Sequence, residues 1–212
     1  MQAKIIDITR NKNYENYLYR CLAPMPFRKY KSRNEYLEKA IAKGFHKKLL
    51  TFNNRIVGQI EYASPEASGY PIMGDDIIVL NCVWVLRKAK GHSFGKVLIE
   101  DMVDNEKCAA GFATISLENH WSPWFMKWQM EKFGFRPVDS IKVSHKLKRK
   151  EQSFGIYLMW MPIKEKAKLP AWDKQKILEG LTFCLAHPLY RPQTFKGNIF
   201  EEKTCFRRRK LV

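Results

Sequence analysis

Apolar positions along the chain follow two alternating patterns, short runs with a period of two and longer stretches with helical spacing. The first pattern is typical of strands and the second of amphipathic helices. Seven segments are predicted strands: residues 3–9, 48–52, 55–62, 77–86, 112–117, 141–147 and 155–161. Four segments are predicted helices: residues 13–22, 32–43, 94–108 and 124–133. This order predicts a mixed sheet with helices on both faces.

The pattern changes after residue 163, where a basic stretch precedes shorter apolar segments. We therefore divide the chain into a domain of residues 1–163 and a C-terminal extension of residues 164–212. Within the extension, the pattern predicts a helix over 171–179, a strand over 181–185 and a basic tail over 207–210. Its turn residues and apolar content predict that the extension packs on the domain, with only residues 207–212 mobile.

Composition and charge limit the class of protein and the kind of partner. Of the 212 residues, 45% are hydrophobic, which excludes disorder as the main state, and the net charge of +17 favours a polyanionic or phosphate-rich partner. No charge-free apolar stretch approaches the ~20 residues that a membrane-spanning helix needs. No secretory signal follows Met1, and the five scattered cysteines are typical of a reducing compartment, so we expect a cytoplasmic protein without disulfides.

A basic loop between a predicted strand and a predicted helix carries the strongest chemical signal. Its glycines and cations are Gly91, Gly95, Arg87, Lys88, Lys90 and Lys96. A helix N-terminus presents unpaired N–H groups and partial positive charge, so this arrangement predicts an anion site. The phosphate-loop pattern G-x-x-x-x-G-K-[ST] fails because Val97 follows Lys96, and the G-x-G-x-x-G spacing is absent. A nucleotide triphosphatase and a dinucleotide-binding domain are therefore disfavoured.

The same loop resembles the acetyl-CoA motif of the GNAT acetyltransferase superfamily, a strand followed by [Q/R]-x-x-G-x-[G/A] and a helix. Lys90 stands where Arg or Gln is usual, Ser93 replaces the first glycine and Gly95 matches the second. Residues 131–135, EKFGF, resemble the end of the family's next helix. The C-terminal extension is similar to that of a bacterial and archaeal subgroup. The resemblance implies that acetyl-CoA binds at Val83, Trp84, Val85, Lys90, Gly91, His92, Ser93, Phe94, Gly95 and Lys96.

The resemblance also implies a fold class and an activity. The fold is an α/β (α+β) GNAT-like one, with a mixed, mostly antiparallel central sheet, helices on both faces and a splay between the fourth and fifth strands, residues 77–86 and 112–117. The activity is N-acetyl transfer from acetyl-CoA, as cosubstrate, to a primary amine that attacks the thioester directly. Many GNAT enzymes place a tyrosine acid where this chain has Met130, so water, Tyr157 or Tyr62 would have to protonate the leaving thiolate.

Several residues are candidates for the base that accepts the amine proton. Glu118 is the preferred one because it ends the fifth predicted strand, at the expected mouth of the splay; Asp75, Asp76 and His120 are the others. The tryptophans at positions 121, 124 and 128 are expected to form core and helix packing and not a cage for the acceptor. Cys184 and His187 have a C-x-x-H spacing, but a zinc site needs about four ligands, so we expect no metal.

Other functions fit parts of the same evidence. Basic clusters at residues 28–33, 142–150 and 207–210 would suit a nucleic-acid-associated protein, although no known nucleic-acid motif is present. Met130 and Ser93 would suit a GNAT-like protein that binds acyl-CoA without transferring it. For an enzyme, the acids Glu61, Glu66, Asp75 and Asp76 favour a polyamine-like, aminoglycoside-like or lysine-containing acceptor, and the overall charge equally favours an acidic molecule with one free amine.

Overall fold

A single large sheet forms the centre of the molecule in the computed structural model, which describes residues 3–18, 22, 31–121, 125–146, 152–179 and 200–203. The strands lie in the order β1-β2-β3-β5-β6-β8-β7-β10, and every neighbouring pair is antiparallel except β5 and β6. Their bounds are β1 Ala3–Asp7, β2 His46–Phe52, β3 Arg55–Ala63, β5 Ile77–Val85, β6 Gly111–Glu118, β7 Arg136–His145, β8 Ser153–Pro162 and β10 Phe200–Glu202. This confirms the predicted mixed, mostly antiparallel sheet.

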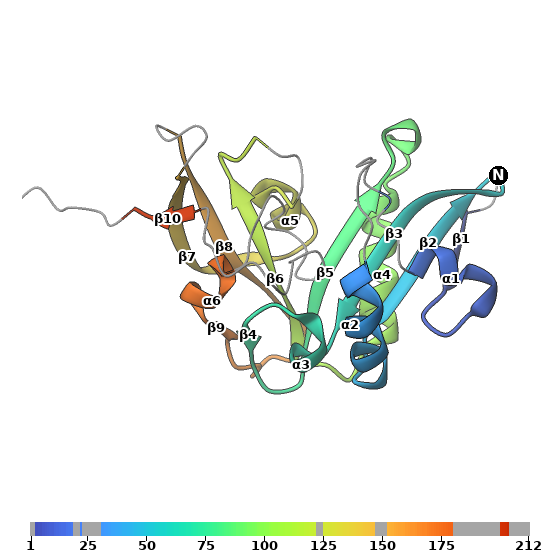
Figure 1. The fold of residues 1–212 in the computed structure, drawn as a ribbon, viewed down its shortest axis with the longest axis horizontal. Coiled ribbons are helices and arrows are strands. Elements are labelled where there is room, and N and C mark those ends of the chain that lie inside the picture. The colour runs from blue at the N-terminus through green and yellow to red at the C-terminus, as the bar shows by residue number, and fades with distance from the viewer. Residues whose placement is uncertain are drawn as a thin grey trace, which may run out of the picture.

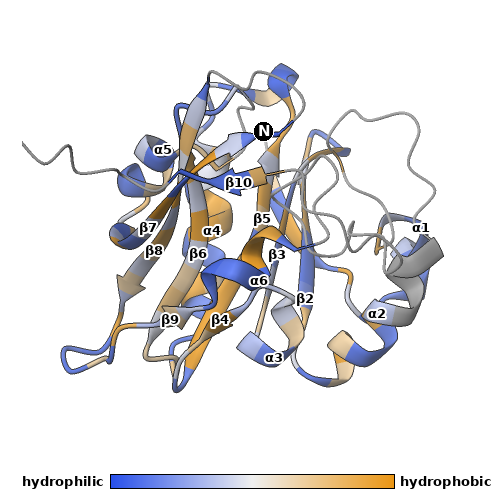
Figure 2. Ribbon diagram, turned by 60° about the vertical axis from the view of Figure 1, so that its left-hand side comes forward, coloured by the Kyte–Doolittle hydropathy of each residue, from blue (hydrophilic) through white to orange (hydrophobic). Residues whose placement is uncertain are grey.

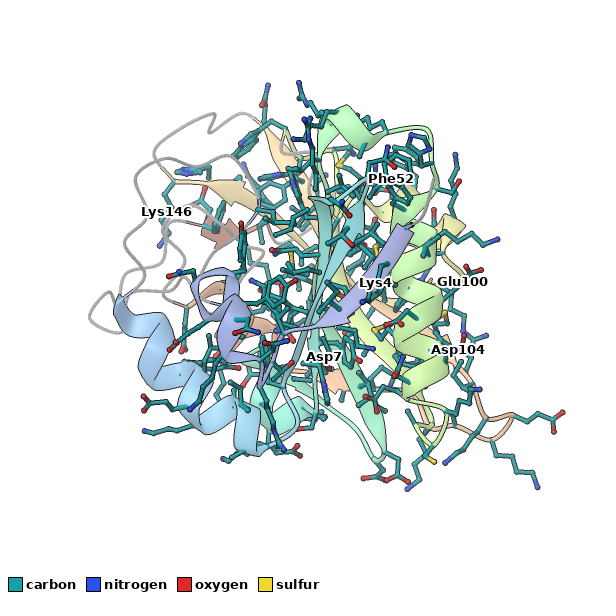
Figure 3. All side chains as sticks on the ribbon, turned by 90° about the vertical axis from the view of Figure 1, so that its right-hand side faces the viewer. Lys4, Asp7, Phe52, Glu100, Asp104 and Lys146 are labelled. Atoms are coloured by element: carbon teal, nitrogen blue, oxygen red, sulfur yellow. The ribbon has the colours of Figure 1, made fainter. Side chains whose placement is uncertain are left out.

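Helices cover both faces of this sheet, as predicted. Figure 3, which looks onto the β1 edge, shows α2 (Lys31–Ala42) on one face and α4 (Phe94–Asn105), with Glu100 and Asp104, on the other. The short helices α1 (Glu15–Leu18) and α3 (Pro65–Ser68) accompany α2. Helix α5 (Lys127–Lys132) lies on the α4 side, where it contacts β6.

Strands β5 and β6 stay together for only a short distance. Residues 77–79 of β5 pair in parallel with residues 111–113 of β6, and Figure 1 shows the two strands diverging beyond that point. A register shift against β3 leaves Asn81 as an extra residue in β5. Such a bulge bends the strand that carries it, so Asn81 helps to turn β5 away from β6. Its side-chain NH₂ donates to the Ser68 carbonyl and holds the bulge in place.

The apolar pattern of the chain is buried in two clusters. One fills the space between the sheet and α4 and continues across β6, β7 and β8, and the other joins α1 and α2 to β1, β2 and β3. Strand β5 is apolar on both faces because it lies in the middle of the sheet, and residues 79–82 are fully or almost fully buried. Among the described residues, no helix is long and apolar enough to span a membrane.

A buried ion pair lies beside the second apolar cluster, on the face of the sheet that α2 covers. Lys47 of β2 and Glu61 of β3 have side chains that are 0% exposed, with 2.7 Å between Nζ and Oε1. Gln59 contacts the same carboxylate through Nε2 at 3.5 Å, and Lys47 Nζ also reaches the Leu18 carbonyl at 3.5 Å. Leu18 belongs to α1, and Leu49, on the same side of β2 as Lys47, packs in the cluster with α1 and α2, so these helices cover the pair.

The first part of the C-terminal extension packs on the domain, as predicted. Strand β9 (Ala171–Trp172) pairs with β4 (Ile72–Met73), and Figure 2 shows α6 (Lys174–Leu178) in front of the sheet with α4 behind it. The Trp172 indole N–H donates to Asp139 Oδ2 at 2.8 Å, and Lys174 Nζ lies 2.7 Å from Asp139 Oδ1. Strand β10, at the end of the described chain, pairs with β7.

We expect Asp139→Asn to loosen this part of the extension and to speed its cleavage by trypsin under native conditions. Burial raises the pKa of the Asp139 carboxyl, but hydrogen bonds from Lys174 and Trp172 outweigh it and lower the pKa overall. The carboxylate contacts therefore stabilise docking at neutral pH and are lost as the pH falls through this lowered pKa, so the wild type should also become more sensitive in acid.

The matched control is Glu165→Gln, which removes a carboxylate from the same extension at an exposed position. Its cleavage rate should equal that of the wild type. Rapid trimming of the wild type to about residue 165 would contradict a docked extension.

Several predicted elements differ from the observed ones. The loop predicted over 63–76 contains α3 and β4, and the first predicted helix is a 3₁₀ turn over Lys12–Tyr14 followed by α1. The helix predicted over 171–179 begins only at Lys174 because the Asp173 carboxylate caps it, accepting from the N–H groups of Gln175 and Lys176. The strand predicted over 181–185 and the tail over 207–212 lie outside the described residues.

Candidate active site

A cleft of about 670 Å³ opens where β5 and β6 part. One wall is the end of β5 with the loop that leads into α4, and the opposite wall is α5 with the residues on either side of it. Figure 1 shows α5 beside β6 and across the gap from β5. The cleft therefore lies at the predicted splay between the fourth and fifth predicted strands, which are β5 and β6.

The β5 wall consists of Val83, Trp84 and Val85, which are partly exposed. These residues pair with residues 58–60 of β3 on one side, while the described residues of β6 pair with β5 only up to Val79. The backbone edge of β5 that faces β6 is therefore available to an extended ligand, which can bind it as an added strand would.

The loop after β5 is shaped for an anion. A 3₁₀ turn over Arg87–Ala89 is followed by Gly91 at φ 91° and Ser93 at φ 54°, both in the left-handed region. In α4, the Lys96 and Val97 N–H groups bond to the Ser93 carbonyl, and the preceding N–H groups of the first turn have no intrahelical acceptor. Arg87, Lys88 and Lys90 are exposed around this turn, so positive charge and free N–H groups meet at one end of the cleft.

Most of the predicted cofactor residues line this cleft, and two do not. The lining includes Val83, Trp84, Val85, Lys90, Gly91, Ser93, Phe94 and Gly95. His92 instead packs its ring on Phe52 and Phe94, with ring centroids 4.9 and 5.0 Å away. The Lys96 ammonium lies 3.6 Å from the carboxylate of Glu100, one turn along α4. For both, a role in binding the cofactor stays a prediction.

Apart from Met130, the residues of the α5 wall were not identified as site residues from the sequence. This wall is lined by Phe125, Trp128, Gln129, Met130, Lys132 and Phe133. The expectation that the tryptophans pack in the core is wrong for Trp121 and Trp128, which are 45% and 52% exposed; Trp124 lies outside the described residues. An amphipathic pattern shows that a helix has an apolar side, but not that a cleft separates this side from its neighbour.

Gly95 sets the distance between the two walls. A Cβ atom at this position would lie 3.0 Å from Cζ of Phe133, which follows α5. The sequence placed Gly95 in the predicted anion site, and the structure shows that this glycine also lets α4 approach Phe133 at the end of α5.

Glu118, the preferred base, lies at the end of β6 and is held by two donors. The Tyr157 hydroxyl donates to Oε2 at 2.6 Å, and the Lys127 ammonium donates to Oε1 at 3.0 Å. These hydrogen bonds, first that of Tyr157 and then that of Lys127, lower the pKa of the Glu118 carboxyl. The carboxylate is therefore ionised at neutral pH, and the group is a weaker base than an isolated glutamate.

The other candidates lie elsewhere. Asp75 and Asp76 precede β5, whereas the cleft is at its other end, about 25 Å away at ~3.3 Å per residue. The His120 ring packs on Trp121 and Phe154, with centroids 4.0 and 4.6 Å away. Tyr62 is buried beside α4, and burial together with Glu106 and Asp101 raises its pKa, which makes it unsuitable as an acid in the cleft.

The acidic cluster that was expected to attract a cationic acceptor does not form. Glu61 is buried against Lys47, and Asp75 lies 3.1 Å from Lys168 at the far end of β5. Within the described ranges, no group of three or more His, Cys, Asp or Glu side chains could hold a metal ion. Cys184 and His187 lie outside those ranges.

Comparison with solved structures identifies the fold. The chain is similar to a GNAT family protein from Desulfovibrio desulfuricans (TM-score 0.52, 11% identity), to the ribosomal-protein-S18-alanine N-acetyltransferase from Escherichia coli (0.51, 12%) and to a Bacillus subtilis acetyltransferase in complex with CoA (0.50, 12%). The matches cover 77%, 79% and 77% of this chain and 100% of each of those chains. No family model and no curated protein sequence matches the chain. The fold is therefore the GNAT fold, as the sequence predicted.

Proposed function

We propose that this protein is an acetyl-CoA-dependent N-acetyltransferase that acts on a primary amine. The observation that carries the proposal is the cleft where β5 and β6 part, with an open strand edge on one side and the N-terminus of α4 at its end. A long, flexible ligand with a phosphate-rich end and an extended amide chain fits both features. Acetyl-CoA is such a ligand, and the Bacillus subtilis neighbour is in complex with CoA.

In this proposal, the phosphates lie at the first turn of α4, near the exposed cations Arg87, Lys88 and Lys90. The pantetheine arm lies along Val83, Trp84 and Val85, and a backbone N–H of this edge points at the thioester carbonyl. A preorganised donor of this kind contributes about 3–4 kcal/mol to transition-state stabilisation, and fixed orientation contributes about 7–11 kcal/mol. The cleft therefore supplies the larger part of catalysis before any acid or base acts.

The amine nitrogen attacks the thioester carbon, the C–S bond breaks so that CoA leaves as a thiolate with the electron pair on sulfur, and Glu118 accepts the proton that the nitrogen loses. A general base adds about 10²–10⁴-fold. The name of the Escherichia coli neighbour states an alanine of ribosomal protein S18 as its acceptor, so peptide amines belong in the first group of acceptors to be tried. A screen of acetyl-CoA consumption over peptides, amino acids, polyamines and aminoglycosides tests the activity, and tight CoA binding without turnover on any of them would favour a non-catalytic acyl-CoA-binding protein.

We expect Gly95→Asp to weaken CoA binding strongly in titration calorimetry. The new side chain meets Phe133 and narrows the cleft, and its carboxylate places negative charge at the phosphate end. Gly95→Asn is the matched control, because it has the same shape without the charge. We expect the Asn variant to bind CoA more weakly than the wild type and more tightly than the Asp variant, and equal binding by all three proteins would show that the site is assigned wrongly.

A further inference from the structure

Two exposed side chains of α5 lie at the mouth of the cleft, and neither belongs to the site residues that the resemblance implied. Trp128 and Lys132 both line the cleft. Trp128 is 52% exposed and Lys132 is exposed as well, whereas Phe125 and Met130 of the same wall are 3% and 1% exposed. Phe125 and Met130 therefore form the depth of this wall, and Trp128 and Lys132 form its rim.

Positive charge lies on both sides of this mouth. The described lining residues include the cations Arg87 and Lys90 on the β5 side and Lys132 on the α5 side, and no carboxylate is among them. Glu131, the acid next to Lys132 in sequence, is already paired, with 3.6 Å between its Oε1 and Lys127 Nζ. A cleft lined by cations attracts a polyanion, so phosphate groups are favoured at the α5 rim as well as at α4.

Trp128 and Lys132 share one side of α5 because they are four residues apart. The Lys132 ammonium lies 4.9 Å from the centroid of the Trp128 ring. The next residue, Phe133, meets the first turn of α4, since a Cβ atom at Gly95 would lie 3.0 Å from Phe133 Cζ. Five residues of α-helix span only about 7.5 Å. A group that is joined to a phosphate at α4 can therefore reach the Trp128 ring.

This inference rests on the proposed function, in which CoA carries the acetyl group. Beyond its diphosphate, CoA ends in an adenosine with a 3′-phosphate, that is, in an aromatic base and a further phosphate group. Aromatic side chains bind such bases by stacking, and lysine ammonium groups bind phosphates. We propose that Trp128 stacks on the adenine of CoA and that Lys132 pairs with its 3′-phosphate. The ammonium lies over one face of the indole, so the base stacks on the other face.

The pair selects the class of acyl donor. A donor that shares only the phosphopantetheine arm, such as an acylated carrier protein, lacks both groups that Trp128 and Lys132 bind. A purely structural role makes a different prediction. If the contact between the ammonium and the ring only stabilised α5, its loss would weaken the binding of every ligand of the cleft by the same factor. Ligands without the adenine or without the 3′-phosphate therefore separate the two roles.

The first experiment measures the Kd of CoA, 3′-dephospho-CoA and 4′-phosphopantetheine by titration calorimetry. In Trp128→Ala, we expect Kd to rise about 5–150-fold for CoA and dephospho-CoA, the effect of losing one stacked base, and to stay unchanged for phosphopantetheine. Trp121→Ala is the matched control, because Trp121 is 45% exposed but does not line the cleft, and it should bind all three ligands as the wild type does. An equal loss for all three ligands in Trp128→Ala, or no loss for CoA, would overturn stacking.

The second experiment tests the lysine with the same ligands. In Lys132→Met, we expect Kd to rise about 10-fold for CoA and to stay unchanged for dephospho-CoA, which has no 3′-phosphate. Lys107→Met is the control, because it removes an exposed positive charge after α4, and it should change neither Kd. Equal losses for CoA and dephospho-CoA in Lys132→Met would overturn the pairing with the 3′-phosphate.

Fluorescence gives a readout that does not depend on affinity. Adenine that stacks on an indole quenches its emission, so saturating CoA should quench the wild type more than Trp128→Phe. Phosphopantetheine controls for Trp84, the other tryptophan that lines the cleft, and should quench both proteins equally. Equal quenching of the two proteins by CoA would contradict stacking on Trp128. Failure of the wild type to bind CoA would count against the proposed function itself, whereas CoA binding no tighter than that of phosphopantetheine would overturn only this inference.

Discussion

We expect Glu118→Gln to lower kcat/KM for the true acceptor by about 10²–10⁴-fold while CoA binding stays unchanged. The amide keeps the shape of the side chain but cannot accept the amine proton. Because its pKa is lowered, Glu118 stays ionised through the neutral range, so the pH dependence of the wild type should follow the acceptor amine. The deficit of the variant should shrink as rising pH deprotonates that amine in solution.

Asp75→Asn is the control for this measurement. It removes a carboxylate that sequence reasoning also considered as a base, but that lies at the other end of β5, beside Lys168. Its kcat and KM should equal those of the wild type. If Glu118→Gln raises KM and leaves kcat unchanged, Glu118 attracts the acceptor and does not take its proton; if both constants stay unchanged, it has neither role.

The largest expected effect on stability comes from Lys47→Met, which removes the ammonium that lies 2.7 Å from the fully buried Glu61 carboxylate. Breaking one side of a buried pair costs about 3–5 kcal/mol in the free energy of unfolding, because a charge remains in the interior. Each kcal/mol shifts the melting temperature of a chain of this size by about 2–4 °C. Urea denaturation should therefore show a much lower midpoint for this variant.

Two comparisons test the cause of that loss. Adding Glu61→Leu to Lys47→Met removes the buried carboxylate as well, so the double variant should recover much of the lost free energy of unfolding. Lys96→Met breaks a pair whose side chains are 67% and 59% exposed, so its free energy of unfolding should change by no more than about 0.5 kcal/mol. A double variant as unstable as Lys47→Met would show that packing, and not charge, holds this part of the interior.

Much of the fold could be predicted from the sequence because its signals are local. The apolar run of β5, the glycines of the loop after it and the helical spacing of α4 each need only neighbouring residues to be recognised. The bulge at Asn81 is an intermediate case: a polar residue interrupts an otherwise apolar strand, which marks an irregularity without showing that the strand bends there.

The features that sequence reasoning missed depend on segments that are distant along the chain. Lys47 and Glu61 are charged residues of neighbouring strands, and nothing in the local pattern shows that helices cover them and make the pair internal. Lys127 and Glu118 are nine residues apart across a loop, a separation with no structural period. That the alternative candidates Asp75 and Asp76 lie far from the cleft could have been predicted, since β5 runs away from them and the cleft is at its opposite end.

The brief parallel contact between β5 and β6 also determines how the molecule can deform. Among the described residues, the ladder that joins β1, β2, β3 and β5 to β6, β8, β7 and β10 is limited to residues 77–79 and 111–113. Within each half, the strands are joined along most of their length by antiparallel ladders. A rotation of one half of the sheet against the other is therefore resisted by few main-chain hydrogen bonds at this joint, and it would widen or narrow the gap between β5 and β6.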